Sequence, residues 1–214
     1  MLNENKKTAR IAGIWYLANI VILMFSYMFV DAKLLVSGDA ALSLSNINAN
    51  KPLFYLGCAA FLIGYVCITM SALTLMKLFK PVCPKQAALI PILLIIGVII
   101  VFIGKAIELY AAVTQNAGLL AVRENIDMSA EIFWGLWLLP IGMLIFRSKL
   151  MPKIVGILLF VACLSHVVAF AVFFFAHDFF ANAETVIYAL GMGEFVLVAW
   201  LLIKGVKVQE QKVF

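Results

Sequence analysis

The chain has 214 residues, of which 65% are apolar and 13% are charged, and its formal net charge is +5. A soluble domain carries about 25% charged and about 45–50% apolar residues, so this composition excludes an ordinary soluble enzyme and predicts an integral membrane protein. At about 20 residues per crossing, the length allows roughly six spans and no soluble domain of ordinary size.

Six apolar segments follow one another along the chain. Lipid cannot satisfy the backbone of an open strand, and no run of alternating polarity indicates a barrel strand. Each segment is therefore predicted to be a helix, and residues 1–214 to form a single all-α transmembrane domain, a six-helix bundle. The predicted helices span residues 9–30, 52–76, 87–109, 132–146, 154–176 and 185–203.

The basic residues are distributed unevenly between the two ends of these helices. Twelve lie on the side that holds the N-terminus, whereas Lys33, Lys51 and Arg123 are assigned to the other side. Because cytoplasmic loops carry the excess of lysine and arginine, both termini are predicted to be cytoplasmic. The same asymmetry accounts for the pI of about 9.0, and nucleic-acid binding is therefore not expected.

Two local signals concern the shape of the bundle. Asp39 can cap a short helix over residues 40–47 in the first outer connection. Such a helix would lie on the outer leaflet or fold back as a lid, and an ordinary loop is the alternative. Pro140 cannot donate a backbone hydrogen bond to the carbonyl of Leu136, so it is expected to kink the fourth helix.

Ionisable side chains within spans are costly, at about 2.5–3.5 kcal/mol each near mid-helix, and are therefore candidates for function. Lys105 and Glu108 are three residues apart, so they share a helix face and can pair. Glu131 enters the next helix at the same outer level. These three residues form either an outer-leaflet site for an anionic head group and a proton or cation, or a packing ion pair with Glu131 reaching water.

His166 and Glu194 form a second pair of candidates. His166 lies 13 residues after Lys153 and Glu194 ten residues after Glu184, which places both near mid-membrane at about 1.5 Å per residue. Asn19 and Thr69 are polar neighbours at similar depth. The pair can relay protons, bind the polar group of a hydrophobic ligand, or simply tie two helices together. With Cys163 the set falls short of a metal site, so none is predicted.

Motifs of enzymes and cofactor sites are absent from the sequence. It contains no G-x-S-x-G, H-E-x-x-H, Walker loop or G-x-G-x-x-G, and its four cysteines show no C-x-x-C spacing. No cofactor is predicted, and the cysteines are interpreted as small apolar residues.

One stretch is specific enough to carry a resemblance. IFWGLWLLPIGMLIFRSKLMPKIVGILL, at residues 132–159, joins a Leu-Pro-x-Gly centre to a basic Arg-Ser turn and a Pro-Lys-x-x-Gly helix start. Together with ARIAGIWYL near the N-terminus and SGDA in the first outer connection, it resembles the bacterial membrane-protein family called domain of unknown function 4386. The resemblance implies a six-helix protein of the bacterial inner membrane and implies no activity.

The functional prediction is a bundle that binds a hydrophobic or amphipathic small molecule near His166 and Glu194. The alternatives are a proton-coupled transporter, an enzyme acting at the outer leaflet through Glu131 or Glu108, and a structural or regulatory subunit. Membrane lipids are the expected surroundings, and the sequence predicts no oligomeric state.

Overall fold

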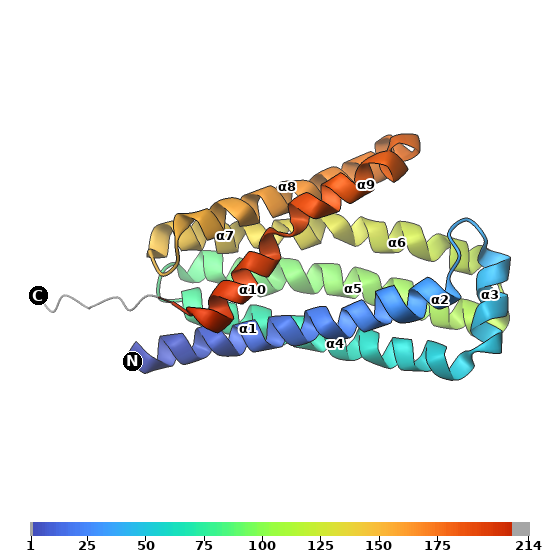
Figure 1. The fold of residues 1–214 in the computed structure, drawn as a ribbon, viewed down its shortest axis with the longest axis horizontal. Helices are drawn as coiled ribbons and strands as arrows, with labels where there is room; N and C mark the ends of the chain where they lie inside the picture. Colours follow the sequence, from blue (N-terminus) through green and yellow to red (C-terminus); the bar gives the residue numbers. More distant parts are fainter. Residues whose placement is uncertain (1, 207–214) are drawn as a thin grey trace, which may run out of the picture.

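The computed structural model describes residues 2–206, and within that range the chain is helical with no strand. Six stretches are long and apolar enough to cross a membrane, so the protein is a multi-pass membrane protein (Figure 1). The spans cover Glu4–Leu34, Lys51–Phe79, Pro84–Thr114, Ala117–Ser148, Lys153–Phe175 and Asn182–Ile203.

Three of the six spans are built from more than one helical element. Span one consists of α1 (Leu2–Met24), the π-helix η1 (Phe25–Asp31) and α2 (Ala32–Leu34). Spans two, three and five are the single helices α4 (Lys51–Phe79), α5 (Pro84–Thr114) and α8 (Lys153–Phe175). Span four is α6 (Ala117–Leu136) with α7 (Leu138–Ser148), and span six is α9 (His177–Gly191) with α10 (Gly193–Ile203).

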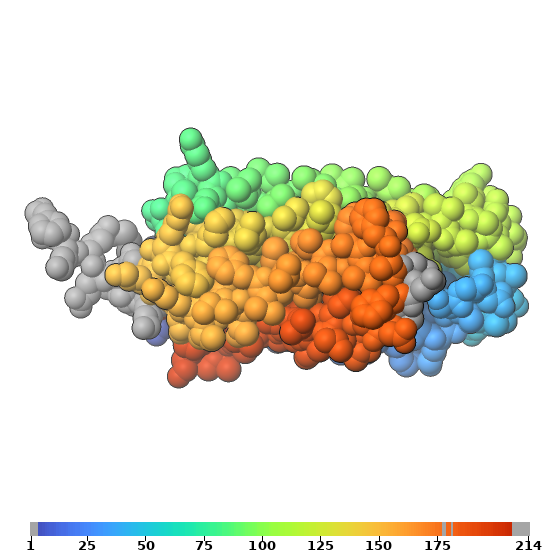
Figure 2. Space-filling view, turned by 90° about the horizontal axis from the view of Figure 1, so that it is seen from above, coloured from blue at the N-terminus to red at the C-terminus, as the bar shows by residue number. Residues whose placement is uncertain are grey.

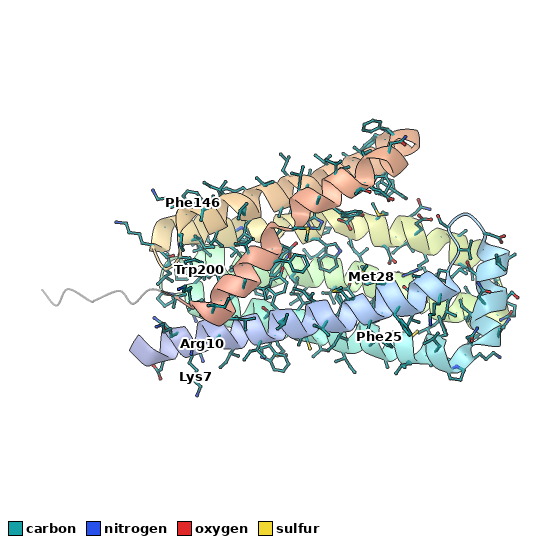
Figure 3. The ribbon with its side chains drawn as sticks, viewed as in Figure 1. Lys7, Arg10, Phe25, Met28, Phe146 and Trp200 are labelled. Carbon is teal, nitrogen blue, oxygen red and sulfur yellow. The ribbon has the colours of Figure 1, made fainter. Side chains whose placement is uncertain are left out.

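The spans form a closed ring in which each packs on its neighbours in sequence, and α10 returns to pack on α1. The start of α1 and the end of α10 lie at the same end of the bundle (Figure 1). Gly205, just beyond α10, lies beside Lys6. We call this the terminal end and the opposite one the α3 end. Figure 3 shows Lys7 and Arg10 at the terminal end, with Trp200 near it and Met28 toward the α3 end.

The α3 end is covered by a short helix that lies across the ends of the spans (Figure 1). This is α3 (Ala40–Ala49), and the Asp39 carboxylate caps it by accepting from the Leu42 amide at 2.9 Å. The predicted short helix is confirmed. Its buried Leu44 and Ile47 belong to a small core together with Val30 and Phe54, so α3 is fixed to the bundle by apolar packing.

Two spans are interrupted near their middle. Span four breaks at Trp137, between α6 and α7. Pro140 follows three residues later, and its missing N–H leaves the Leu136 carbonyl without its helical partner. The helix is therefore interrupted in the turn where the kink is expected. Span six breaks at Met192, flanked by Gly191 and Gly193. Beyond this break α9 packs along α8 and diverges from α1 (Figure 1).

The fourth span is longer than the sequence indicated. It was expected over residues 132–146, with a loop before it, but α6 begins at Ala117. Arg123, Glu124 and Asp127 lower the local hydropathy, which is why this segment was interpreted as a loop. The helix persists because Arg123 and Asp127 find partners inside the bundle.

The last two spans are shorter than the others. α8 has 23 residues and span six, from His177 to Ile203, has 27, whereas the first four spans have 29 to 32. The surface formed by α8 and α9 therefore stops short of α3, and the ends of the other spans project past it (Figure 2).

Candidate functional site

A chain of hydrogen bonds joins four spans near the middle of the bundle. Nδ1 of His166 lies 2.7 Å from Oε2 of Glu131, and Nε2 of the same ring lies 3.1 Å from Oε1 of Glu194. The Tyr16 hydroxyl donates to the other oxygen of Glu194. Because these residues belong to α1, α6, α8 and α10, one imidazole connects spans four, five and six, and Tyr16 adds span one.

Glycines allow the helices to approach closely around this chain. A Cβ at Gly135 would lie 2.6 Å from the Cys163 carbonyl oxygen, and one at Gly193 would lie 2.4 Å from that of Leu158. α6 and α10 therefore pack against α8 with no side chain between the backbones. Glu194 also lies in the first turn of α10, where the positive end of the helix dipole stabilises a carboxylate.

The hydrogen-bond geometry sets a minimum of two protons for this site. Each of the two imidazole–carboxylate contacts needs one proton, whichever tautomer the ring adopts. With these two protons and no others, the imidazole and the two carboxylates together carry a net charge of −1. The Glu131, His166 and Glu194 side chains are only 15%, 15% and 20% exposed, so this charge is largely removed from solvent.

Three members of this chain line a partly open pocket of about 190 Å³. Tyr16, His166 and Glu194 supply polar groups, and Asn19 lines the pocket while its amide donates to the Gly64 carbonyl at 3.0 Å. The remaining lining residues are apolar or aromatic: Leu23, Tyr65, Ile68, Leu94, Trp134 and Trp137. We call this the mid-membrane pocket.

A second polar cluster lies toward the α3 end and is organised by Arg123. Its Nη2 lies 3.0 Å from Asp31, and its Nε lies 2.8 Å from Glu108 and 3.0 Å from Asp127. The Lys105 ammonium contacts Glu108 at 2.9 Å and lies 3.9 Å from Asp31. We call these five residues the Arg123 cluster. Its formal charges, two positive and three negative, also leave −1.

The structure brings some of the predicted residues together and separates others. His166 and Glu194 meet, as their matching depth suggested, and Lys105 pairs with Glu108. Glu131 does not join Lys105 and Glu108 as expected, because α6 starts early and carries it to the level of His166. Thr69 donates to the Tyr65 carbonyl of its own helix at 2.8 Å and is not part of the pocket lining.

Sequence reasoning missed Asp31, Arg123 and Asp127, which had been placed outside the membrane spans. The available signal was the spacing of Arg123 and Asp127, four residues apart, which suits an ion pair on a helix. If residues 117–136 had been predicted as a helix, Arg123 and Asp127 would have been placed on the same helix face, where they could pair with each other and with a residue of a neighbouring span.

A second pocket, of about 390 Å³, adjoins the Arg123 cluster at the α3 end. Asp31, Arg123 and Asp127 line it together with Ser43 and the connection before α3, whereas Lys105 and Glu108 are absent from its described lining. Between the two pockets the hydroxyls of Tyr27 and Tyr65 lie 3.1 Å apart. Tyr65 also lines the mid-membrane pocket, so polar groups continue from one pocket toward the other.

Among the described residues, no group of three or more His, Cys, Asp or Glu side chains is placed to hold a metal ion. The Glu131–His166–Glu194 set illustrates the reason. The two carboxylates contact opposite nitrogens of one ring, so the three side chains do not converge on a common point.

A comparison with protein families identifies the chain. The model of a domain of unknown function, DUF4386, matches residues 11–205. The chain belongs to the DUF4386 family. The matched region of this DUF4386 protein contains both polar clusters and the lining of both pockets. No curated protein and no solved structure matches the chain.

Proposed function

We propose that this DUF4386 protein binds one small hydrophobic or amphipathic molecule in the mid-membrane pocket. One observation carries the proposal: Tyr16, Glu194 and His166, joined by hydrogen bonds, line a cavity whose other walls are apolar and aromatic apart from Asn19, and Glu131 holds the far side of the His166 ring. Small-molecule sites combine apolar walls with a few fixed polar groups that orient the ligand.

The depth of the pocket favours a ligand that reaches it from the lipid. Glu194 lies ten residues before Lys204 and His166 lies 13 after Lys153, which corresponds to about 15 Å and about 20 Å from the terminal end at 1.5 Å per residue. A molecule that dissolves in the bilayer arrives at this depth without crossing the polar ends of the bundle.

The test is native mass spectrometry of protein extracted in a mild detergent, followed by identification of the released molecules. The wild type should carry one small molecule per chain. Glu194→Gln should carry less, because the substitution changes the charge and proton count of the polar wall. Glu184→Gln, on the exposed side of the same span, should behave as the wild type. Equal occupancy in all three proteins would contradict binding at this pocket.

A second candidate, proton-coupled transport, is favoured by the Tyr27–Tyr65 contact between the two pockets and by the breaks in spans four and six. Interrupted helices and intramembrane histidine–carboxylate sets are found in transporters. The test uses proteoliposomes that contain a pH-sensitive dye. Under an imposed pH gradient, the wild type should acidify the lumen, and Tyr65→Phe should slow this acidification. Equal rates in protein-containing and protein-free liposomes would rule out this candidate.

We further propose that the protein resides in a bacterial inner membrane with its terminal end cytoplasmic. The support is the concentration of Lys6, Lys7 and Arg10 at that end together with the basic connections between spans two and three and between spans four and five. The α3 end would then face the outside, with the Arg123 cluster near the outer boundary of the hydrocarbon.

A further inference from the structure

We propose that the occupant of the mid-membrane pocket is a lipophilic cation, an amine or quaternary ammonium group attached to an apolar body. This rests on the proposed binding function and specifies its ligand class. The ammonium group would lie against Glu194 and the aromatic rings of the pocket, and the apolar body would extend toward the lipid between α1 and α9.

The first argument is charge balance. With one proton in each imidazole–carboxylate contact and none elsewhere, Glu131, His166 and Glu194 together carry one net negative charge. Within the described part of the chain, no lysine or arginine is among the residues that line the pocket. Lys105 and Arg123 are already outnumbered by carboxylates in their own cluster. A charge at this depth is stabilised by an ion of opposite sign, and a monovalent cation restores neutrality.

The second argument is the aromatic lining. Tyr16 packs on Trp137 with ring centroids 5.6 Å apart, and Tyr65 stacks on Trp134 at 5.7 Å. All four rings line the pocket. Electron-rich rings attract ammonium groups, with tryptophan the strongest, and aromatic cages are a recurrent way of holding quaternary ammonium ligands. A carboxylate and two tryptophans around one cavity therefore select for a cation over a neutral or anionic head group.

The third argument is the position of the pocket relative to the break in span six. α1, α8 and α10 contribute to its lining, together with α4, α5 and α6. Just beyond Glu194 toward the α3 end, α9 follows α8 away from α1 (Figure 1). Apolar side chains on both diverging segments are exposed, among them Val21, Met24 and Leu190. A cation held at Glu194 can thus carry an apolar tail that remains in lipid.

The experiment compares three amphiphiles that share one tail and differ in head-group charge. Dodecyltrimethylammonium, dodecyl maltoside and dodecyl sulfate are titrated, below their micellar concentrations, into protein reconstituted in lipid nanodiscs. Saturable change in tryptophan fluorescence reports the pocket, since Trp134 and Trp137 line it. Empty nanodiscs give the background from partitioning into lipid. The variants are Glu194→Gln, Glu194→Asp, Trp134→Leu and, as the matched control, Glu184→Gln.

The proposal predicts that the cationic amphiphile binds at least about tenfold more tightly than the other two, a difference of about 1.4 kcal/mol. Glu194→Gln should remove this preference, Glu194→Asp should retain most of it, and Glu184→Gln should leave it unchanged. Trp134→Leu should weaken binding of the cationic amphiphile by about threefold or more, and should weaken binding of the neutral amphiphile less. Thermal melting of each variant identifies any that fail to fold, and the aspartate variant then tests the charge alone.

The possible failures are distinct. If the neutral or anionic amphiphile binds as tightly as the cation and binding still depends on Glu194, the cation preference is overturned while the binding function stands. If none of the three shows saturable binding to the folded wild type, both are overturned.

Discussion

At the scale of single residues, His166 is the group on which the mid-membrane site depends. One ring satisfies two carboxylates from two other spans, and neither carboxylate has a lysine or arginine partner among the described ion pairs. Removing the ring would leave Glu131 and Glu194 with like charges and no shared proton donor. The stabilising effect of His166 is therefore expected at the upper end of the range for an interhelical hydrogen bond, about 0.6–2 kcal/mol.

His166→Leu should accordingly lower the free energy of unfolding by about 2 kcal/mol, below the full cost of breaking a deeply buried pair because these side chains are partly exposed. Adding Glu131→Gln and Glu194→Gln to this variant should recover part of the loss, since the unpaired charges are then gone. Equilibrium unfolding in mixed detergent micelles measures the free energy of unfolding of the single and the triple variant. A triple variant less stable than the single variant would contradict the charge argument.

At the scale of helices, close backbone contacts fix the site. Gly193 starts α10 directly before Glu194, and its Cα faces the Leu158 carbonyl of α8, where a Cβ would lie at 2.4 Å. The carbonyl belongs to the backbone and cannot rotate away as a side chain would. The separation of spans five and six, and with it the His166–Glu194 distance, depends on the absence of one methyl group.

Gly193→Ala should therefore destabilise the protein by about 1–3 kcal/mol, the usual range for an overpacked interface, and should weaken ligand binding by moving Glu194 from His166. Gly118→Ala, in α6 with only the Asn116 side chain nearby at 3.3 Å, is the matched control and should have little effect. Thermal melting and amphiphile titration of the two variants check this. If Gly193→Ala and Gly118→Ala melted at the same temperature, α10 would be able to move away from α8 without a loss of stability.

The Arg123 cluster links helices in a different way, through charge. Arg123 on α6 contacts Asp31 of η1 and Glu108 of α5, so one side chain holds spans one, three and four together. Glu108 is buried, with 1% of its side chain exposed. Loss of Arg123 would leave three carboxylates with Lys105 as their one remaining described cation.

Arg123→Met should thus cost about 3 kcal/mol in the free energy of unfolding, the lower end of the range for breaking a buried ion pair. The same substitution at the exposed Lys51, also at the α3 end, should cost little, as for surface charges generally. Denaturation of both variants under identical conditions is the comparison. If Arg123→Met were as stable as Lys51→Met, the cluster would not be holding the spans.

At the scale of the whole molecule, the proposed orientation gives the two ends different accessibilities. Ser37 is exposed in the connection before α3, and Lys85 is exposed at the start of α5 at the terminal end. Three of the four native cysteines are buried, and Cys83 is half-buried, so a background with Cys83→Ser should react weakly with a maleimide.

In that background, a membrane-impermeant maleimide should label Ser37→Cys in intact spheroplasts. It should label Lys85→Cys only after the membrane is permeabilised. The reverse pattern would place the termini outside and overturn the proposed topology.

Much of the fold was predictable because lipid leaves helices as the natural solution for long apolar runs. The six spans and the α3 helix followed from hydropathy and the Asp39 cap. The early start of α6 did not, since Arg123 and Asp127 look like loop residues until their partners are known. Likewise, matching depth suggested that His166 and Glu194 could meet, but Glu131 was misplaced by the error in α6. Pairing between distant helices is a tertiary property that hydropathy does not contain.

The unequal lengths of the spans have a consequence for the surrounding lipid. α5 has 31 residues and α8 has 23, a difference of about 12 Å at 1.5 Å per residue, so no single hydrocarbon thickness fits both. A thin bilayer suits α8 and leaves the Arg123 cluster near water. Longer acyl chains would draw the cluster's uncompensated charge into hydrocarbon, at a cost that grows with each ångström. The bundle is therefore expected to be least stable in long-chain lipids, so its stability would report bilayer thickness.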